Sequence, residues 1–287
     1  SSATLLKPYL VSALCHFLVH LLSDSELVFL PPEDLGSVAR LYRESPRTAF
    51  VGSPMHLLMG ASSIGPAAEP AFFFSSGDFI YANKIAELLA RFPKSKFYLV
   101  YGLAELAGRF FVNELDASSP AERLGSVGSC IDGTRYRIED GALFVDSDFL
   151  FLGYIVDGKY VPRAGSHPSG DLAREEGGVV YLRGRSNDQV KVGGNKVSLQ
   201  HIERTVSEIL VDDVCVVVGS EHRLLGTVIA LVLCSKRDYG RTELLGRFKD
   251  RLQPHELPHL FYRIDKVPYT QTMKIDRRAV QGALGTL

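Results

Sequence analysis

The sequence predicts an α/β protein followed by a smaller α+β domain, and three observations indicate this organisation. Short apolar segments alternate with amphipathic helical segments up to about residue 115, which is typical of a mostly parallel sheet. Residues 118–185 are rich in glycine and alternate with a period of two, which predicts a small antiparallel or barrel-like layer. Helix and strand signals then return over about one hundred residues, the usual size of a domain. We therefore expect one domain over 1–186 and a second over 187–287.

Helix and strand signals follow one another in order through the first domain. The segment 10–22 is apolar enough for a helix, and Pro31-Pro32 ends the strand that precedes the second helix. Ile85, Leu88 and Leu89 share one face of a third helix. Helices are expected at 10–22, 33–41 and 83–91, and strands at 26–30, 48–51, 72–74 and 97–100.

Turn and capping signals organise the rest of the chain. Asp140-Gly141 separates two alternating segments and predicts a hairpin. Ser198 can cap a helix whose apolar residues line up on one face. The polar, glycine-containing join at 184–194 can act as a hinge. Strands are expected at 134–139, 142–145, 179–182, 214–218, 227–233 and 261–264, and a helix at 242–252.

Composition and charge exclude several classes of protein. Lys and Arg total 32 and Asp and Glu total 33, so the net charge of −1 excludes a strongly basic nucleic-acid binder. No apolar run is long enough for a membrane span, and 10–22 lacks the features of a signal peptide. The 4 cysteines are widely spaced without a CxxC pair, so we expect buried thiols in a reducing, cytoplasmic compartment.

Two candidate binding turns directly follow predicted strands: Ser75-Ser76-Gly77-Asp78-Phe79 and Tyr101-Gly102-Leu103-Ala104-Glu105. In an open α/β sheet, ligands bind beyond the carboxyl ends of the strands. A tyrosine ring can stack on a base, a glycine lets the backbone approach a phosphate, and a carboxylate can hold Mg²⁺. Taken alone, the first segment is more often a plain turn between a strand and a helix. The second is equally consistent with a binding loop and with an ordinary strand end that carries a buried tyrosine and a solvated glutamate.

Three further segments carry candidate binding groups. Asp171 follows a glycine turn and can accept both hydroxyls of a ribose, while Arg185 offers a planar fork of donors. Gly193-Gly194 permits large backbone rotation beside the expected domain junction. Lys274 precedes a short terminal helix, and its mobile charge can reach a phosphate. The alternative interpretations are a plain hairpin turn for the Asp171 segment, a flexible linker for Gly193-Gly194 and a solvated lysine for Lys274.

In this order, the five segments resemble those of the adenylate-forming superfamily, which comprises acyl- and aryl-CoA synthetases, nonribosomal adenylation domains and luciferases. The resemblance extends from about His16 to Arg277. It implies a partial large domain, with an α/β layer and a small β-barrel-like layer, followed by a small mobile α+β domain that rotates between two reaction steps. The family's Ser/Thr/Gly-rich phosphate loop has no counterpart upstream of His16, so we expect the N-terminal part of the large domain to be missing.

The resemblance also implies a role for individual residues. Lys274 matches the catalytic lysine of adenylation, and Glu105 matches the carboxylate that holds Mg²⁺. Asn187 matches the hinge position, Gly194 the passage of the thiol arm, and His16 the acyl pocket. The expected nucleotide-binding residues are Gly77, Asp78, Phe79, Tyr101, Gly102, Ala104, Asp171 and Arg185.

Three of the matching positions depart from the family pattern. Ala104 stands where Thr or Ser is usual, so one hydroxyl contact to a phosphate is absent. Asn187 replaces the common hinge aspartate, although Asp188 beside it can substitute. Met273 replaces the glycine that usually precedes the lysine, which restricts the loop but keeps its charge.

The implied activity is ATP-dependent activation of a carboxylic acid to an acyl-adenylate, followed by transfer to a thiol of CoA or of a carrier protein's phosphopantetheine. ATP and Mg²⁺ are the implied cofactors, and the acid and a carrier protein the implied partners, without nucleic acid or a membrane span. No aspartate lies within 15–20 to hold the ammonium of an amino acid, so an acyl or aryl acid is favoured.

The alternative is a catalytically reduced homologue that binds a nucleotide or a partner protein without adenylation. The absent phosphate loop favours this alternative. Retention of Glu105, Asp171, Arg185 and Lys274 together argues against it, because a pure scaffold has no need of all these groups.

Overall fold

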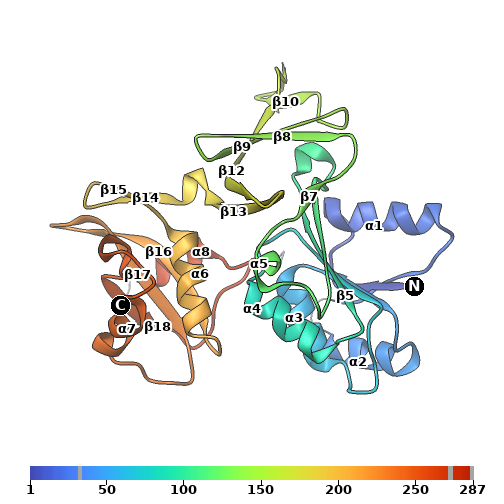
Figure 1. Cartoon of the computed structure of the whole chain (residues 1–287), viewed down its shortest axis with the longest axis horizontal. Helices are drawn as coiled ribbons and strands as arrows, with labels where there is room; N and C mark the ends of the chain where they lie inside the picture. The colour runs from blue at the N-terminus through green and yellow to red at the C-terminus, as the bar shows by residue number, and fades with distance from the viewer. Residues whose placement is uncertain (32–33, 271–273, 285–287) are drawn as a thin grey trace. The chain divides into compact units, whose positions relative to one another are not determined.

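The computed structural model describes residues 1–31, 34–270 and 274–284, with only the backbone of Asn187. The chain divides into two compact units, whose elements are labelled in Figure 1. Unit 1 comprises Ser1–Ser169 and Ala173–Leu182, and unit 2 comprises Gly170–Leu172 and Arg183–Leu287. Asp171 therefore belongs to unit 2, although its strand lies mostly in unit 1. The expectation that residues 187–287 form a mobile domain remains a prediction.

The main sheet of unit 1 is mostly parallel, so the α/β class predicted from the sequence is confirmed. Its strand order is β2-β1-β3-β4-β5-β6-β7. The pairs from β2 through β5 are parallel, and β6 pairs antiparallel with β5 and β7. The strands are β1 (Ser2–Thr4), β2 (Leu27–Phe29), β3 (Ala49–Gly52), β4 (Phe72–Ser76), β5 (Lys96–Tyr101), β6 (Phe111–Leu115) and β7 (Ser129–Cys130).

Helices connect these strands, and the sequence predicted most but not all of them. Asp34 caps α2 by accepting from the Ser37 amide at 2.9 Å, and this helix runs to Glu44 rather than to residue 41. The sequence analysis missed α3, since Gly60 weakens its helical pattern. A Cβ on Gly60 would lie 2.2 Å from the Phe50 ring, so close packing requires glycine there. The helices are α1 (Val11–Leu22), α2 (Leu35–Glu44), α3 (Pro54–Ser63), α4 (Ala82–Arg91), α5 (Ala121–Leu124) and the 3₁₀ turn η1 (Ala104–Leu106).

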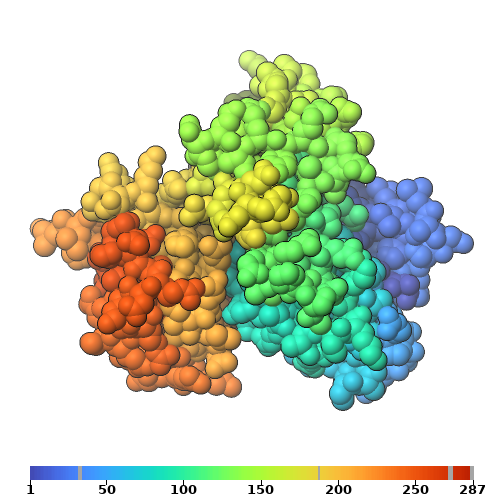
Figure 2. Space-filling model, viewed as in Figure 1, coloured from blue at the N-terminus to red at the C-terminus, as the bar shows by residue number. Residues whose placement is uncertain are grey.

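Helix α1 has a buried inner face and an exposed apolar outer face. Its inner residues Ala13 and His16 are buried. Its outer residues are exposed, and Leu22 has 86 % of its surface open to solvent. Figure 2 shows this helix as a separate blue ridge on the surface of unit 1. The exposed apolar side chains are Val11, Leu14, Phe17, Leu18, Val19, Leu21 and Leu22.

The β-rich layer of unit 1 consists of antiparallel strands, as predicted. Asp140 and Gly141 have φ of 49° and 80°, the left-handed conformation of a tight hairpin turn. A second Asp-Gly turn, at Asp157-Gly158, forms a hairpin that the sequence analysis did not predict. One sheet has the order β13-β12-β9-β8, and β10 pairs with β11. The strands are β8 (Thr134–Glu139), β9 (Ala142–Ser147), β10 (Gly153–Val156), β11 (Lys159–Pro162), β12 (His167–Glu176) and β13 (Val179–Arg185).

Unit 2 is built on a sheet of order β16-β17-β18 with helices packed on it, which agrees with the α+β expectation. The Ser198 hydroxyl accepts from the His201 amide at 3.3 Å and caps α6, as predicted. The join is not an irregular linker, because β14 and β15 form a hairpin. The elements are η2 (Ser186–Asp188), β14 (Gln189–Val192), β15 (Asn195–Ser198), α6 (Leu199–Ile209), β16 (Val214–His222), β17 (Gly226–Cys234), α7 (Arg241–Phe248), η3 (Pro254–Glu256), β18 (Leu260–Arg263) and α8 (Arg277–Leu284).

The cysteines differ from the sequence expectation in their burial. All are free thiols, but only Cys215 is buried, while Cys15, Cys130 and Cys234 are partly exposed. Cys130 and Cys234 nevertheless pack against the apolar cores of their units. Within the described ranges, none of the helices combines the length and apolarity needed to cross a membrane.

A buried ion pair joins three elements of unit 2. Glu203 of α6 is only 3 % exposed. Its carboxylate accepts from the Arg277 guanidinium through two bonds, of 2.6 and 2.7 Å, and from the Val217 amide at 2.8 Å. Arg277 also donates to the Val217 carbonyl at 3.1 Å. The pair therefore fastens the start of α8 to α6 and β16.

Replacing Arg277 by alanine should destabilise the protein by about 3 kcal/mol, because Glu203 would keep a buried charge without its main partner. Urea unfolding followed by circular dichroism measures this change. Arg278→Ala is the matched control, since Arg278 is exposed, and it should change the free energy of unfolding by less than about 0.5 kcal/mol. An equal effect of both variants would contradict the role given to the pair.

Candidate functional site

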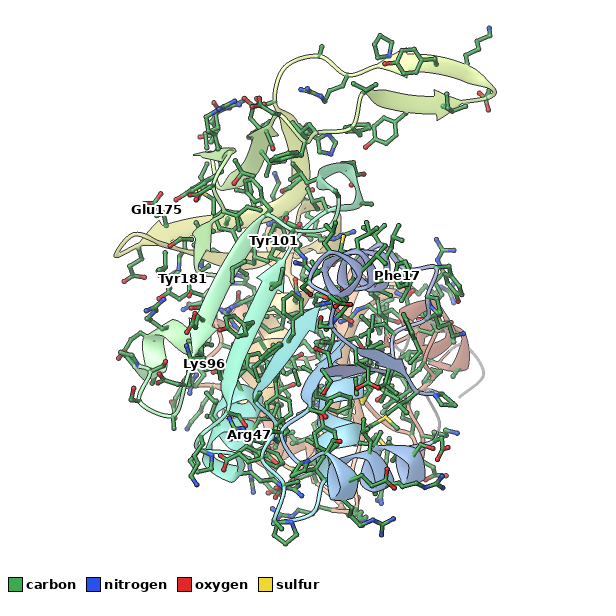
Figure 3. All side chains as sticks on the ribbon, turned by 90° about the vertical axis from the view of Figure 1, so that its right-hand side faces the viewer. Phe17, Arg47, Lys96, Tyr101, Glu175 and Tyr181 are labelled. Atoms are coloured by element: carbon green, nitrogen blue, oxygen red, sulfur yellow. The ribbon has the colours of Figure 1, made fainter. Side chains whose placement is uncertain are left out.

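The two predicted binding turns of unit 1 leave the sheet side by side. Strands β4 and β5 are parallel, with Ser76 opposite Val100, so the turn at Gly77 and the turn at Tyr101 begin at the same edge. Figure 3 shows Tyr101 and Lys96 at opposite ends of β5, with Phe17 of α1 near the Tyr101 end. The parallel register therefore gathers the first two predicted segments at the carboxyl ends of the strands.

The first turn has the backbone conformation that its glycine predicts. Gly77 has φ of +88°, a conformation that other residues rarely adopt, and a Cβ there would meet no atom within 4 Å. The Asp78 carboxylate accepts from the Phe79 amide at 2.9 Å. The Phe79 ring contacts Tyr81 edge-on, with centroids 5.3 Å apart. The turn is thus ordered by its own side chains and keeps open space over Gly77.

The second turn folds back on itself so tightly that Gly102 cannot be replaced without movement. A Cβ on Gly102 would lie 2.1 Å from the Gly108 carbonyl oxygen and 2.7 Å from the Arg109 amide nitrogen. The left-handed residues Ala107 and Gly108 make this reversal. The 3₁₀ turn η1 lies inside it and presents Ala104 and Glu105, the first of which is exposed. The predicted loop is therefore a tight reversal of the backbone, in which Gly102 approaches Gly108 closely.

Glu105 is held in place by the neighbouring β-rich layer. Its carboxylate accepts a hydrogen bond from the Tyr154 hydroxyl at 3.1 Å, and its backbone carbonyl accepts from the Phe151 amide at 2.8 Å. The hydrogen bond to Glu105 and burial raise the pKa of Tyr154, with burial the larger cause. Sequence analysis missed Tyr154, because 49 positions separate it from Glu105 and no local signal links them.

His16 lies on the inner face of α1 against the end of β4. Its ring meets Phe74 edge-on, with centroids 4.4 Å apart, and the buried Nε2 has no hydrogen-bond partner among the described residues. Ser12 of the same helix hydrogen-bonds Ser76 at 2.5 Å. Burial, and then the charge of Arg109, lowers the pKa of His16 to about 3, so the imidazole is neutral near pH 7.

In unit 2, the structure brings Asp171 and Arg185 together. Asp171 is 8 % exposed, and its Oδ1 lies 3.3 Å from the Arg185 Nε. The Ser186 hydroxyl of η2 donates to the Gly170 carbonyl of β12 at 3.1 Å. Gly184 has φ of +103° beside this pair, and a Cβ would lie 2.9 Å from the Ser198 hydroxyl. The Arg185 side chain remains largely exposed.

The other predicted residues of unit 2 lie on turns. Asn187 is in η2, and Gly194 is the second residue of the β14–β15 turn, with φ of +90°. The exposed Lys274 precedes α8, where its amide donates to the Thr270 hydroxyl at 3.2 Å. Its carbonyl accepts from the Thr270 amide at 2.8 Å. Met273, a predicted departure, lies outside the described residues.

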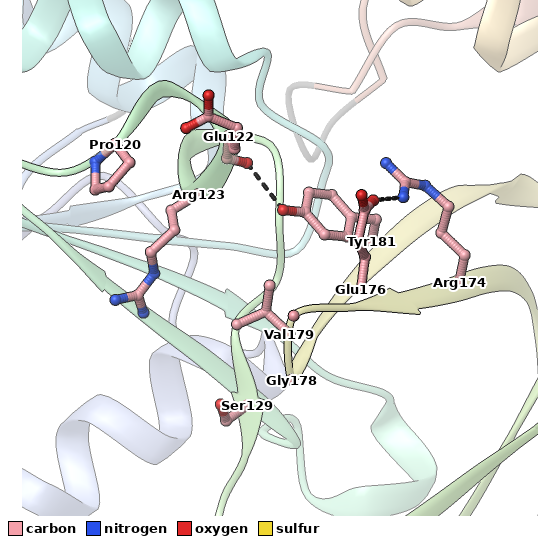
Figure 4. A pocket seen from close by; sticks show the side chains of 10 residues that line it. Pro120, Glu122, Arg123, Ser129, Arg174, Glu176, Gly178, Val179 and Tyr181 are labelled. Carbon is pink, nitrogen blue, oxygen red and sulfur yellow. Dashed lines mark hydrogen bonds and ion pairs between the residues drawn. The ribbon is translucent and has the colours of Figure 1, made fainter.

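The described residues also line a pocket of about 780 Å³ in unit 1, between α5 and the β12–β13 hairpin (Figure 4). The Arg174 guanidinium stacks on the Tyr181 ring at 4.5 Å and pairs with Glu176. The Tyr181 hydroxyl donates to the Glu122 carbonyl at 3.1 Å. None of the predicted site residues lines this pocket.

The class of fold is clear from solved structures. The o-succinylbenzoate CoA synthetase of Bacillus subtilis, solved with an acyl-adenylate intermediate, superposes with a TM-score of 0.80 at 18% identity. The match covers 98% of this chain and 60% of that one. The chain therefore has the fold of adenylate-forming enzymes, which confirms the predicted fold.

Curated relatives carry the same resemblance in sequence, although no family model matches the chain. A D-alanine–D-alanyl carrier protein ligase of Staphylococcus epidermidis is 25% identical over 226 residues, covering 72% of this chain and 46% of the relative. A 2-succinylbenzoate–CoA ligase of the same species is 26% identical over 200 residues, covering 64% of this chain and 40% of the relative. The chain thus spans slightly less than half the length of these relatives.

The lowered pKa of His16 predicts a loss of stability in acid. The pKa is about 3 in the folded state and 6.5 as a free side chain, so only the unfolded chain binds this proton between those values. Stability should therefore fall as pH decreases below about 6.5, by about 1 kcal/mol between pH 7.5 and pH 5.5 from this group alone. Urea unfolding at pH 7.5 and 5.5 measures the loss.

The His16→Phe variant should lose that part of the pH dependence, whereas His255→Gln, on η3 of unit 2, should retain it. An unchanged pH dependence in His16→Phe would show that His16 titrates normally in the folded protein.

Proposed function

We propose that this protein activates a carboxylic acid by adenylation with ATP and transfers the acyl group to the thiol of CoA or of a carrier protein. The observation that carries the proposal is the pair of loops at Gly77 and Tyr101, which the parallel register of β4 and β5 sets side by side at the carboxyl edge of the sheet. Relatives named as a CoA ligase and as a carrier-protein ligase support both kinds of thiol.

The residues of unit 1 suit the recognition of a nucleotide. The open space over Gly77 lets the backbone approach a flat base, and the half-buried Tyr101 ring offers a stacking surface. Gly102 and Ala104 present backbone without a bulky side chain, where a phosphate can approach. Asp78 and Phe79 complete the turn. His16 is proposed to contact the acid from α1.

Glu105 is the proposed holder of Mg²⁺. The ion usually takes one or two protein carboxylates and completes its shell with phosphate oxygens and water, so a single fixed carboxylate fits it. Among the described residues, no cluster of three His, Cys, Asp or Glu forms a separate metal site. When bound, Mg²⁺ would neutralise phosphate charge. The Tyr154 hydroxyl would keep the Glu105 carboxylate in one orientation.

The residues of unit 2 suit the ribose and the reacting phosphate. The ionised Asp171 carboxylate, which lies beside Arg185, is proposed to accept hydrogen bonds from the ribose hydroxyls. Lys274 would place its ammonium near the α-phosphate as the carboxylate attacks and pyrophosphate leaves, stabilising the charge that develops there. Asn187 is proposed as the hinge, and Gly194 as the point where the thiol arm passes in the second step.

Removing the ammonium with Lys274→Ala should lower adenylation by roughly two to three orders of magnitude, because one transition-state charge interaction is lost. Thiol transfer from supplied acyl-adenylate should stay largely intact. ATP–pyrophosphate exchange with a panel of acids measures the first step. Lys266→Ala is the matched control, as this exposed lysine lies shortly before the same loop. Equal loss in both steps would reject the catalytic role of Lys274.

Asp171→Ala should instead weaken ATP binding by roughly tenfold or more, since a charge-assisted hydrogen bond to the ribose is lost. Calorimetric titration with ATP measures this, and Asp212→Ala, at an exposed aspartate of the same unit, should bind as the unchanged protein does. Nucleotide binding without any pyrophosphate exchange in the unchanged protein would favour the alternative of a catalytically reduced homologue.

A further inference from the structure

We propose that the exposed outer face of α1 is an interaction surface through which two copies of this chain associate, with their α1 helices packed antiparallel. The surface goes beyond the proposed function and does not depend on it. The helix forms a ridge on unit 1 (Figure 2), and its outer side chains are apolar.

The exposed residues of α1 have the spacing of a helix–helix seam. Four of them follow one another at intervals of three, four and three positions: Val11, Leu14, Leu18 and Leu21. This is the a and d pattern by which one helix packs its side chains into the spaces of another. His16 lies on the opposite face and is buried in unit 1, so the seam points away from the unit's own core.

The exposed row is large enough for a stable interface. Its side chains keep between 39 % and 86 % of their surface open to solvent. With roughly 200 Å² for a fully exposed large apolar side chain, each copy presents roughly 700 Å² of apolar surface, close to the about 800 Å² that one partner buries in a standard interface. A monomer rarely exposes a contiguous apolar patch of more than a few hundred Å², so a patch of this size indicates an interaction site.

The row is complementary to itself. In an antiparallel pair related by a twofold axis, Leu14 of one copy meets Leu18 of the second copy, and Val11 meets Leu21, so each contact occurs twice. The helix Val11–Leu22 contains no Asp, Glu, Lys or Arg, so the two copies bring no like charges together. A helix that binds a membrane surface usually carries lysine or arginine beside its apolar face, which favours a second copy as the occupant.

Association also braces the two candidate binding loops, because the inner face of α1 contacts both. Ser12 hydrogen-bonds Ser76 at 2.5 Å, at the start of the Gly77 turn. The Cys15 thiol donates to the Ala107 carbonyl at 3.1 Å, in the reversal of the second loop. Packing α1 between its own unit and a second copy stabilises the helix, so both loops are held more firmly in the dimer.

Sedimentation velocity on the full chain tests the proposal. Between about 1 and about 200 µM the unchanged protein should pass from monomer to dimer, with a Kd of about 1–50 µM. Leu18→Glu should weaken association at least about a hundredfold, because the dimer would bury two unpaired carboxylates. Leu224→Glu is the matched control, since Leu224 is 86 % exposed on a turn of unit 2, and it should leave the Kd unchanged.

Mixing two charged variants tests the direction of packing. Leu14→Lys and Leu18→Glu should each associate poorly alone, whereas their mixture should associate at least about tenfold more tightly than either, because the antiparallel pair sets the new ammonium beside the new carboxylate. In a parallel pair these two positions do not meet, so the absence of any gain would reject the antiparallel arrangement. Circular dichroism checks that both variants are folded.

The proposal is overturned if the chain stays monomeric up to about 200 µM, if neither Leu18→Glu nor Leu14→Lys weakens the dimer, or if Leu224→Glu weakens it equally. Binding of a monomer to phosphatidylcholine vesicles, abolished by Leu18→Glu, would overturn it in favour of a membrane surface. A dimer that is sensitive to the α1 variants but shows no pyrophosphate exchange would uphold this surface while rejecting the proposed function.

Discussion

The parallel pairing of β4 with β5 is the constraint on which the candidate site of unit 1 depends. It brings two loops, separated by more than twenty positions in the chain, to one edge of the sheet. The left-handed glycine after β4 and the close approach of Gly102 to Gly108 then fix where each loop can turn. A slip of one residue in this register would turn every side chain of β4 to the opposite face. The loops would then lose their common edge.

Unit 2 depends on a different kind of interaction. Its candidate groups lie on two strands, β12 and β13, and on turns. Charged pairs join these strands and helices, with Asp171 beside Arg185 and Glu203 beside Arg277. The second pair lies three positions after Lys274 and anchors the start of α8, while Lys274 itself is exposed. An exposed cation beside an anchored helix suits a group that must arrive and leave.

Much of the fold could be predicted because its signals are local. The Asp140-Gly141 turn, the Ser198 cap and the apolar face of α4 each depend on neighbours within a few residues. The helix α3 was missed because Gly60 serves packing against Phe50, which is a tertiary requirement. Likewise, the partners of Glu105 and Arg277 lie 49 and 74 positions away, so only the folded chain reveals them. Positions in the site were predictable as motifs, whereas the contacts that orient them were not.

The two faces of α1 have one further consequence. The outer face exposes a row of apolar side chains to water. This exposure is unfavourable in free energy, and other interactions in unit 1 must offset it. The inner face of the same helix holds His16 against Phe74. Any molecule that shields the outer row therefore favours the folded helix and, through it, the geometry around that histidine. Binding of a molecule to the outer face of α1 is thermodynamically linked to the arrangement of His16 on its inner face.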